Sequence, residues 1–266
     1  MPLASTFGSS SARGLGGLGR SVKPPVVATG GTVTDITVNG VPYKLHTFTA
    51  SGTFTVTTGG NIEYMMVGGG ASTNSNSTGG GAGQVIDGNV AVSATSYGIG
   101  VGGATGSSTG LGITANGVSG TTSGNGFAAG SGYSSTFSNS LAGGGGGATA
   151  VGGNATSNTQ PGVGGAGRDI STWLGQSAGS TYKGGGGGGM GYWNVDWGNP
   201  QPGTSAGGVG GGGHGGQGGN SSNGFANSGG GAGSGGGQQG IPYDTGSGRT
   251  GGSGIVYIRY PRDYGV

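Results

Sequence analysis

Hydrophobic and polar residues alternate along the first part of the chain in a way that is typical of β-strands. The alternation is clearest between residues 32 and 67, where β-branched and aromatic residues are frequent. Asn39-Gly40 interrupts it, and this dipeptide is the strongest short signal for a β-hairpin. Phe54 and Val56 are two residues apart and therefore belong on the same face of one strand. The pattern predicts four strands, at residues 32–38, 41–49, 53–57 and 61–67.

A fifth clear strand lies at the other end of the chain. Residues 254–260 read GIVYIRY, and Pro261 ends the strand. Shorter β-like segments occur at residues 85–86, 90–92 and 97–101. Because an isolated hairpin is only marginally stable in water, we expect the strands of both ends to form one small β-scaffold. The alternative is a set of unrelated short strands.

Glycine dominates the sequence between these strands. The chain has 79 glycines among 266 residues, with runs at 143–147, 184–189 and 210–213. Glycine costs about 0.5–1 kcal/mol per position in an ordinary helix or strand, so the runs argue against both. Disorder is the usual alternative, but disordered segments normally carry high charge, and only 6% of these residues are charged. Collagen is excluded because the glycines do not recur at every third position.

A backbone form that glycine permits fits the runs better. Polyproline-II-like helices have three residues per turn and no internal hydrogen bonds, so their amides and carbonyls need partners on neighbouring helices. We therefore expect a mostly β and irregular fold, in which a small β-scaffold from both termini encloses a glycine-rich body of packed polyglycine-II helices. The expected domains are an N-terminal attachment segment at residues 1–30 and a β-framed glycine-rich domain at residues 31–266.

Four segments, taken in order, carry a resemblance to a known family. They read FTASGTFTV at 48–56, IEYMMVGGG at 62–70, GGGAG at 79–83 and GGSGIVYIRY at 251–260. This series resembles the glycine-rich domain of bacteriophage tail-fibre and related virion proteins, over about residues 40–260. The glycine-rich body is also similar to the tail-fibre adhesins of T-even-type phages. That resemblance implies a polyglycine-II sandwich whose loops contact the host surface, although the strong strands at both ends are a departure from those adhesins.

The N-terminal residues 1–27 differ from the rest in charge. They include three basic residues and no acidic one, and they lack the apolar core of a signal peptide. A frayed tail is the usual state of a terminus. We favour a segment that becomes ordered by docking on another virion protein. Its attachment candidates are Phe7, Arg13, Leu15, Leu18 and Arg20.

Residues that carry chemistry are few and scattered. There is no cysteine, and neither His46 nor His214 has a carboxylate or a second histidine at ligand spacing. We expect His46 to be a polar residue on a strand face. The seven acidic residues stand singly, so no carboxylate pair for glycoside hydrolysis is visible. Matches to G-x-G-x-x-G are expected by chance at this glycine content. We expect no enzymatic activity, no metal and no cofactor.

Other classes of glycine-rich protein fit less well. Nine basic residues without Arg-Gly-Gly repeats are too few for nucleic-acid binding, and no apolar stretch is long enough to insert into a membrane. We expect a virion protein at the particle surface, either a tail fibre or a fibre-tip adhesin. A minor capsid or tail decoration protein is the alternative, and an ice-binding or other glycine-rich structural protein is the second. Homo-oligomerisation stays open.

Aromatic residues gather in the inserts between glycine runs. All three tryptophans lie between residues 173 and 197. Aromatic rings beside Asp and Asn suit a receptor such as a carbohydrate or an outer-membrane protein loop. They equally suit a role in capping the ends of the glycine runs. The receptor-binding candidates are Trp173, Tyr182, Tyr192, Trp193, Asn194, Asp196 and Trp197.

Overall fold

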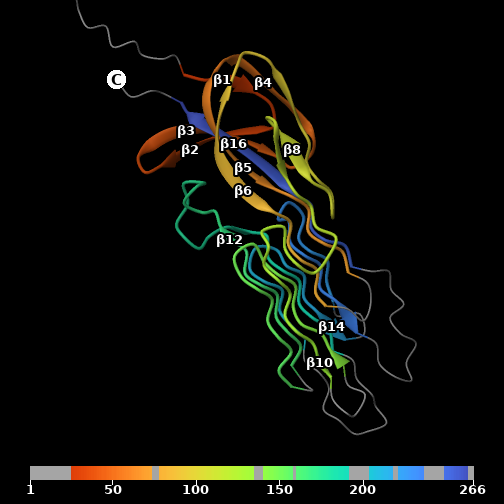
Figure 1. Cartoon of the computed structure of the whole chain (residues 1–266). Helices are drawn as coiled ribbons and strands as arrows, with labels where there is room; N and C mark the ends of the chain where they lie inside the picture. The colour runs from red at the N-terminus through yellow and green to blue at the C-terminus, as the bar shows by residue number, and fades with distance from the viewer. Residues whose placement is uncertain are drawn as a thin grey trace, which may run out of the picture.

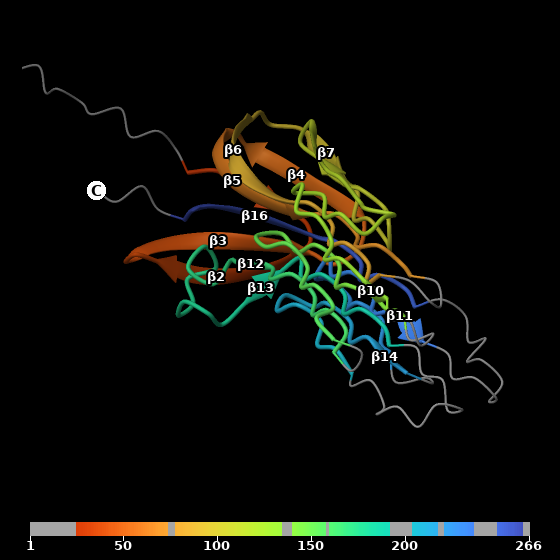
Figure 2. The same ribbon diagram turned by 60° about the horizontal axis from the view of Figure 1, so that its bottom comes forward.

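Strands occupy one end of the molecule, and extended glycine-rich runs fill the other (Figures 1 and 2). The computed structural model describes residues 25–73, 78–134, 140–157, 160–191, 204–217, 221–236 and 249–262. These residues form strands and irregular segments, and no helix occurs among them. The expected fold class, mostly β and irregular, is confirmed.

The larger sheet joins the two ends of the chain. Its strand order is β2-β3-β16-β5-β6, and all neighbours are antiparallel. The last strand, β16 (Ile255–Pro261), lies between β3 (Val41–Phe48) and β5 (Gly60–Val67). The edges are β2 (Thr32–Val38) and β6 (Val85–Val92). The chain therefore closes on itself through the central strand, as the expected scaffold from both ends requires.

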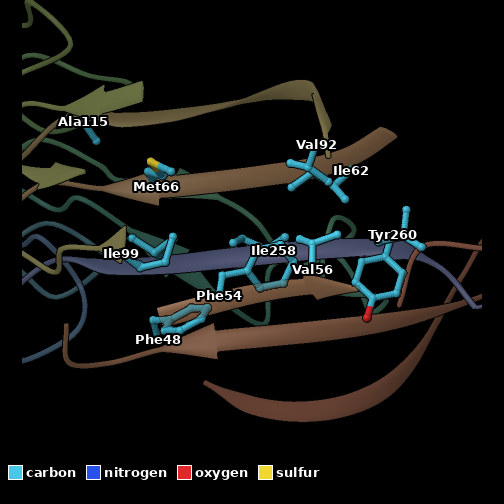
Figure 3. Packing of buried hydrophobic residues seen from close by; sticks show 12 residues of the cluster. Phe48, Phe54, Val56, Ile62, Met66, Val92, Ile99, Ala115, Ile258 and Tyr260 are labelled. Carbon is cyan, nitrogen blue, oxygen red and sulfur yellow. The ribbon is translucent and has the colours of Figure 1, made fainter. Parts of the chain in front are cut away.

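A smaller sheet covers one face of the larger one. It consists of β1 (Val27–Thr29), β4 (Gly52–Thr58) and β7 (Ser96–Ile99), in the order β1-β4-β7. Phe54 and Val56 both point from β4 into the core between the sheets (Figure 3), as the alternation predicted. Because β1 pairs with β4, the β-scaffold, meaning these two sheets, begins ahead of the expected boundary at residue 31. The remaining strands are short: β8 (Ser108–Gly110), β9 (Ile113–Ala115), β10 (Tyr133–Ser134), β11 (Ser140–Leu141), β12 (Arg168–Asp169), β13 (Tyr182–Lys183), β14 (Gly216–Gln217) and β15 (Gly235–Gly236).

His46 is buried in the scaffold and does not lie on a polar strand face as we expected. Its side chain is 0% exposed. Nδ1 lies 2.7 Å from the carbonyl oxygen of Gly30, and Nε2 lies 3.0 Å from the hydroxyl of Tyr260. Burial lowers the pKa of His46 below its usual 6.5. Both ring nitrogens have a hydrogen-bond partner, so a buried histidine is tolerated here.

The glycine-rich runs continue the central strands of the larger sheet. Strand β5 passes directly into the run at 68–73, and the run at 249–254 passes into β16. Pairing continues across the junction, because the Gly68 amide donates to the Gln84 carbonyl and the Gly70 amide to the Gly252 carbonyl, both at 2.9 Å. The bundle of runs is thus fixed in register by the sheet. We call these runs the glycine bundle: residues 68–73, 79–84, 116–124, 128–131, 142–148, 150–155, 162–167, 184–191, 205–216, 222–235 and 249–254.

Hydrogen bonding within the glycine bundle repeats every three residues. All six amides of residues 184–189 donate to other runs, at N···O distances of 2.7 to 3.1 Å. Gly186 and Gly189 donate to the run at 162–167, and Gly185 and Gly188 donate to the run at 205–216. A strand directs its amides to two sides in alternation, whereas these amides have three directions. The same spacing occurs between other runs. The amides of Gly79 and Ala82 donate to the carbonyls of Gly143 and Gly146, respectively, and those of Gly80 and Gly83 donate to Ala232 and Gly229. The amides of Ala142, Gly145 and Ala148 donate to Met190, Gly187 and Gly184 in the same way.

Interior positions of the glycine bundle have no room for a side chain. A Cβ atom on Gly187 would lie 1.8 Å from the carbonyl oxygen of Ala232, and one on Gly186 would lie 2.1 Å from that of Gly145. The Cα hydrogens therefore point at neighbouring carbonyls, where they form weak Cα–H···O contacts. Backbone contact thus takes the place that side-chain packing has in an ordinary core.

Small polar side chains replace missing neighbours at the edges of the glycine bundle. Asn125 pairs with both backbone groups of Val85, accepting its amide at 2.8 Å and donating to its carbonyl at 3.0 Å. The Gln84 side chain accepts the amide of Asn116 at 2.9 Å. The side-chain amides of Asn125 and Gln84 take the place of backbone groups of an adjacent run, so the backbone groups at the edge stay paired.

We predict that Gly187→Ala destabilises the whole domain. The added methyl group would push the neighbouring run away and weaken the bond from the Gly187 amide to Gly80 and the bond from the Gly145 amide to Gly187. Each buried backbone group that loses its partner costs about 1–3 kcal/mol. Denaturant unfolding measures the loss.

The matched control is Gly103→Ala, since a Cβ atom at Gly103 would meet nothing within 4 Å. Equal stability of the two variants would contradict close backbone packing around Gly187.

Candidate contact surface

The runs of the glycine bundle end together on the side away from the β-scaffold (Figures 1 and 2). Isolated bridges pair Thr73 with Arg249 and Leu141 with Gly191 at this side. Strands β14 and β15 pair there in parallel. We call this side the far end. Described residues that are remote in sequence, such as Thr73 and Arg249 or Leu141 and Gly191, are therefore held together in one surface.

Side chains tie the far end together. The Thr73 hydroxyl donates to the carbonyl of Gly233 at 2.8 Å, and the Ser205 hydroxyl donates to that of Gly189 at 2.6 Å. The Arg249 guanidinium donates through Nε to the Ser221 hydroxyl at 2.7 Å. Tyr133 in β10 is 38% exposed. Sequence analysis did not select Tyr133, although it shares the signal used for the others, an aromatic residue between two glycine runs.

Most of the predicted contact residues fall outside the described residues. Five receptor-binding candidates follow Gly191 in the sequence, and the N-terminal attachment candidates precede Pro25. These residues outside the description are Tyr192, Trp193, Asn194, Asp196, Trp197, Phe7, Arg13, Leu15, Leu18 and Arg20. Their assignments stay predictions. The two remaining candidates, Trp173 and Tyr182, are described.

Trp173 and Tyr182 belong to one insert, residues 168–183, which we call the side insert. Strands β12 and β13 close it, with Asp169 opposite Tyr182. The Asp169 carboxylate accepts the amides of Ser171 at 2.9 Å and Gly179 at 2.8 Å. Hydrogen bonds from the hydroxyl and amide of Ser171, with that from Gly179, lower the pKa of Asp169 below its usual 3.8. The carboxylate therefore organises the insert from within.

Trp173 packs against the outer face of the larger sheet. The Arg259 guanidinium lies 4.2 Å from the centroid of the Trp173 ring and 4.8 Å from that of the Tyr43 ring. Arg259 also donates through Nε to Glu63 at 2.8 Å and to the Trp173 carbonyl oxygen. The buried guanidinium of Arg259 thus connects β16 with its two neighbouring strands, β3 and β5, and with the side insert.

The side insert and Gly191 lie at opposite ends of the glycine bundle. Lys183 ends the side insert beside the β-scaffold, and the run at 184–191 leads from there to the far end. Trp173 is half-buried against the larger sheet beside Tyr257, and Tyr182 is half-buried in β13. Receptor contact by either residue stays a prediction. Sequence analysis missed the partner of Trp173, because Arg259 is remote in sequence and its strand pattern gave no sign of an aromatic contact.

Among the described residues, no group of three or more His, Cys, Asp or Glu side chains could hold a metal ion. No helix long and apolar enough to cross a membrane occurs in this part of the chain. Two of the charged side chains have structural partners: Arg168 pairs with Asp87 at 2.7 Å, and Lys183 donates to the Asn227 carbonyl at 2.7 Å. Burial lowers the pKa of Lys183.

Comparison with known families gives one match. The family described as a glycine-rich domain matches residues 48–261, which is more than half of the chain. The chain belongs to this glycine-rich domain family. The matched part runs from the last residue of β3 to the last residue of β16, so the glycine-rich domain includes most of the β-scaffold and the whole glycine bundle. No curated protein and no solved structure matches the chain.

We predict that Trp173→Ala lowers the free energy of unfolding of the glycine-rich domain by about 1–3 kcal/mol, because a half-buried ring and its stacking on Arg259 are lost. Trp173→Phe keeps a ring over the guanidinium and should lose less. Tyr182→Ala is the control on the same insert. Unfolding curves of Trp173→Ala that superpose on those of the unchanged protein would contradict a stabilising role for the stacking of Trp173 on Arg259.

Proposed function

We propose that this chain is a non-enzymatic structural protein of a phage virion, a tail fibre or fibre-tip adhesin. The observation that carries the proposal is the common far end of the runs, where bridges such as Leu141 with Gly191 hold several run ends in one surface. Segments that leave a surface held by backbone hydrogen bonds are well placed for recognition, as loops on a rigid support generally are. The resemblance of four ordered sequence segments to phage tail-fibre proteins supports the same proposal.

We also propose that the runs of the glycine bundle are polyglycine-II helices. The hydrogen-bond period supports this assignment, since pairs of amides three residues apart, such as Gly185 with Gly188 and Gly186 with Gly189, donate to the same neighbouring run, and this helix has three residues per turn. The close backbone approach at positions such as Gly187 gives further support, because a lattice of such helices tolerates few side chains. The assignment would account for a described glycine bundle that is held by backbone hydrogen bonds and has no extensive apolar core.

The partner of the far end would be a host surface receptor, a carbohydrate or an outer-membrane protein loop. Residues 192–197 follow Gly191 directly and offer aromatic rings beside Asn194 and Asp196. Residues 1–24, which precede the β-scaffold in the sequence, would attach the protein to another virion protein. Attachment is restricted to residues 1–24 because Val26 is buried and Val27 pairs with Thr58 in the scaffold.

We predict that changing Trp193 and Trp197 together to Ala abolishes adsorption of the purified chain to host cells. Central aromatic residues of an interface typically cost about 2 kcal/mol or more each when truncated, which corresponds to a loss of affinity of more than tenfold for each ring. Fluorescently labelled protein and a panel of candidate bacterial cells measure adsorption, and thermal melting of the same variant reports folding.

The control is Phe225→Ala, since Phe225 is 59% exposed in the run at 222–235 and lies away from the far end. A folded double variant that adsorbs normally would rule out binding through this insert. Labelling of intact particles tests the position in the virion: signal at fibre tips supports the adhesin, and signal over the shell favours a capsid or decoration protein.

A further inference from the structure

One outer layer of the glycine bundle has no neighbouring run on its outer side. It consists of the runs at 150–155, 162–167 and 205–209, of which the first two are drawn in green along one side of the bundle in Figure 1. The middle run faces inward through Gly162 and Gly165, whose amides donate to Ala142 and Gly145 at 3.0 and 2.9 Å. Among the described residues, nothing covers the opposite side of this layer.

Every third residue of the middle run points outward. A Cβ atom on Gly165 would point at the carbonyl of Ala150 in one adjacent run, and one on Gly164 would lie between Gly186 and Gly208 on the other side. With three residues per repeat, the third direction is the outward one, and Val163 and Ala166 point in it. The neighbouring runs show the same rule, since Val151 and Asn154 are exposed three residues apart, as are Ala206 and Val209.

The outward positions are mainly apolar. Val151, Val163 and Val209 are 61%, 52% and 56% exposed and lie on three adjacent runs. We call this surface the valine face: Val151, Val163, Ala166, Ala206 and Val209. Single exposed apolar residues are normal, but a contiguous apolar patch usually marks an interaction site. Asn154, at the equivalent position of the first run, accepts the Ser131 amide at 2.8 Å, so its side chain binds the run at 128–131 and is not part of the valine face.

We propose that the valine face binds a second copy of this chain, face to face. A two-fold axis brings the same patch of both copies together, so the patch must complement itself. The described residues of the three runs carry no charged side chain, and therefore the patch does not repel its own copy. The whole chain has a net charge of only +2, with 6% charged residues, which leaves little long-range repulsion between copies. A strongly charged partner would find nothing complementary on this face.

The test is sedimentation velocity of the full chain over a wide concentration range. We expect reversible association of the unchanged protein. The triple variant Val151→Asn, Val163→Asn and Val209→Asn should raise the dissociation constant by more than tenfold while its thermal melting stays near that of the unchanged protein, since exposed substitutions have small effects on stability.

The matched control replaces the exposed valines of the β-scaffold, Val27, Val33 and Val41, which are 49%, 44% and 40% exposed, by Asn. It should associate like the unchanged protein. A chain that is monomeric at every concentration, or association that the valine-face variant leaves intact, would overturn the proposal. Equal loss in the control variant would overturn it as well. None of these results depends on host binding, so the proposed function stands or falls separately.

Discussion

Each backbone amide of a buried glycine run needs a hydrogen-bond partner on another run. In residues 184–189 every amide meets this need, and the partner run is the same for Gly185 and Gly188 and for Gly186 and Gly189. Partners at hydrogen-bond distance in three directions bring backbones so close that a Cβ atom would lie within about 2 Å of a neighbouring carbonyl oxygen, as at Gly187. Glycine is therefore the residue that satisfies both requirements, namely paired backbone groups and close approach.

The β-scaffold gives this arrangement its register. Strand β16 comes from the end of the chain and pairs with both β3 and β5, and its pairing with β5 continues into the runs at 68–73 and 249–254. Where the strands become runs, the direction of hydrogen bonding changes from two-sided to three-sided. A conventional apolar core, with Phe54 and Ile258 fully buried, stabilises the sheets, and Arg259 joins the side insert to them through Trp173.

The strands could be predicted from the sequence because their signals are local. Alternation placed Phe54 and Val56 on one face, and Asn39-Gly40 marked the hairpin whose residues adopt φ values of 50° and 81°. The burial of His46 could not be predicted, because it depends on Gly30 and on Tyr260, which is 214 residues away in the sequence. Trp173 was predicted as a receptor contact, which stays a prediction, and its stacking on Arg259 is a long-range contact without a local signal. The neighbours of each glycine run could not be predicted either, because identical glycines carry no information about which run lies beside which.

Residue-resolved hydrogen exchange of the glycine runs tests the central claim most directly. Every amide of residues 184–189 should be protected, because each donates to another run. In the outer run at 162–167, the amides of Gly162, Gly164, Gly165 and Gly167 should exchange slowly. Those of Val163 and Ala166, which donate to no other described residue, should exchange fast. This pattern, with one fast amide in every three, follows from hydrogen bonding in three directions. Fast exchange throughout both runs, or slow and fast amides in strict alternation, would contradict the account.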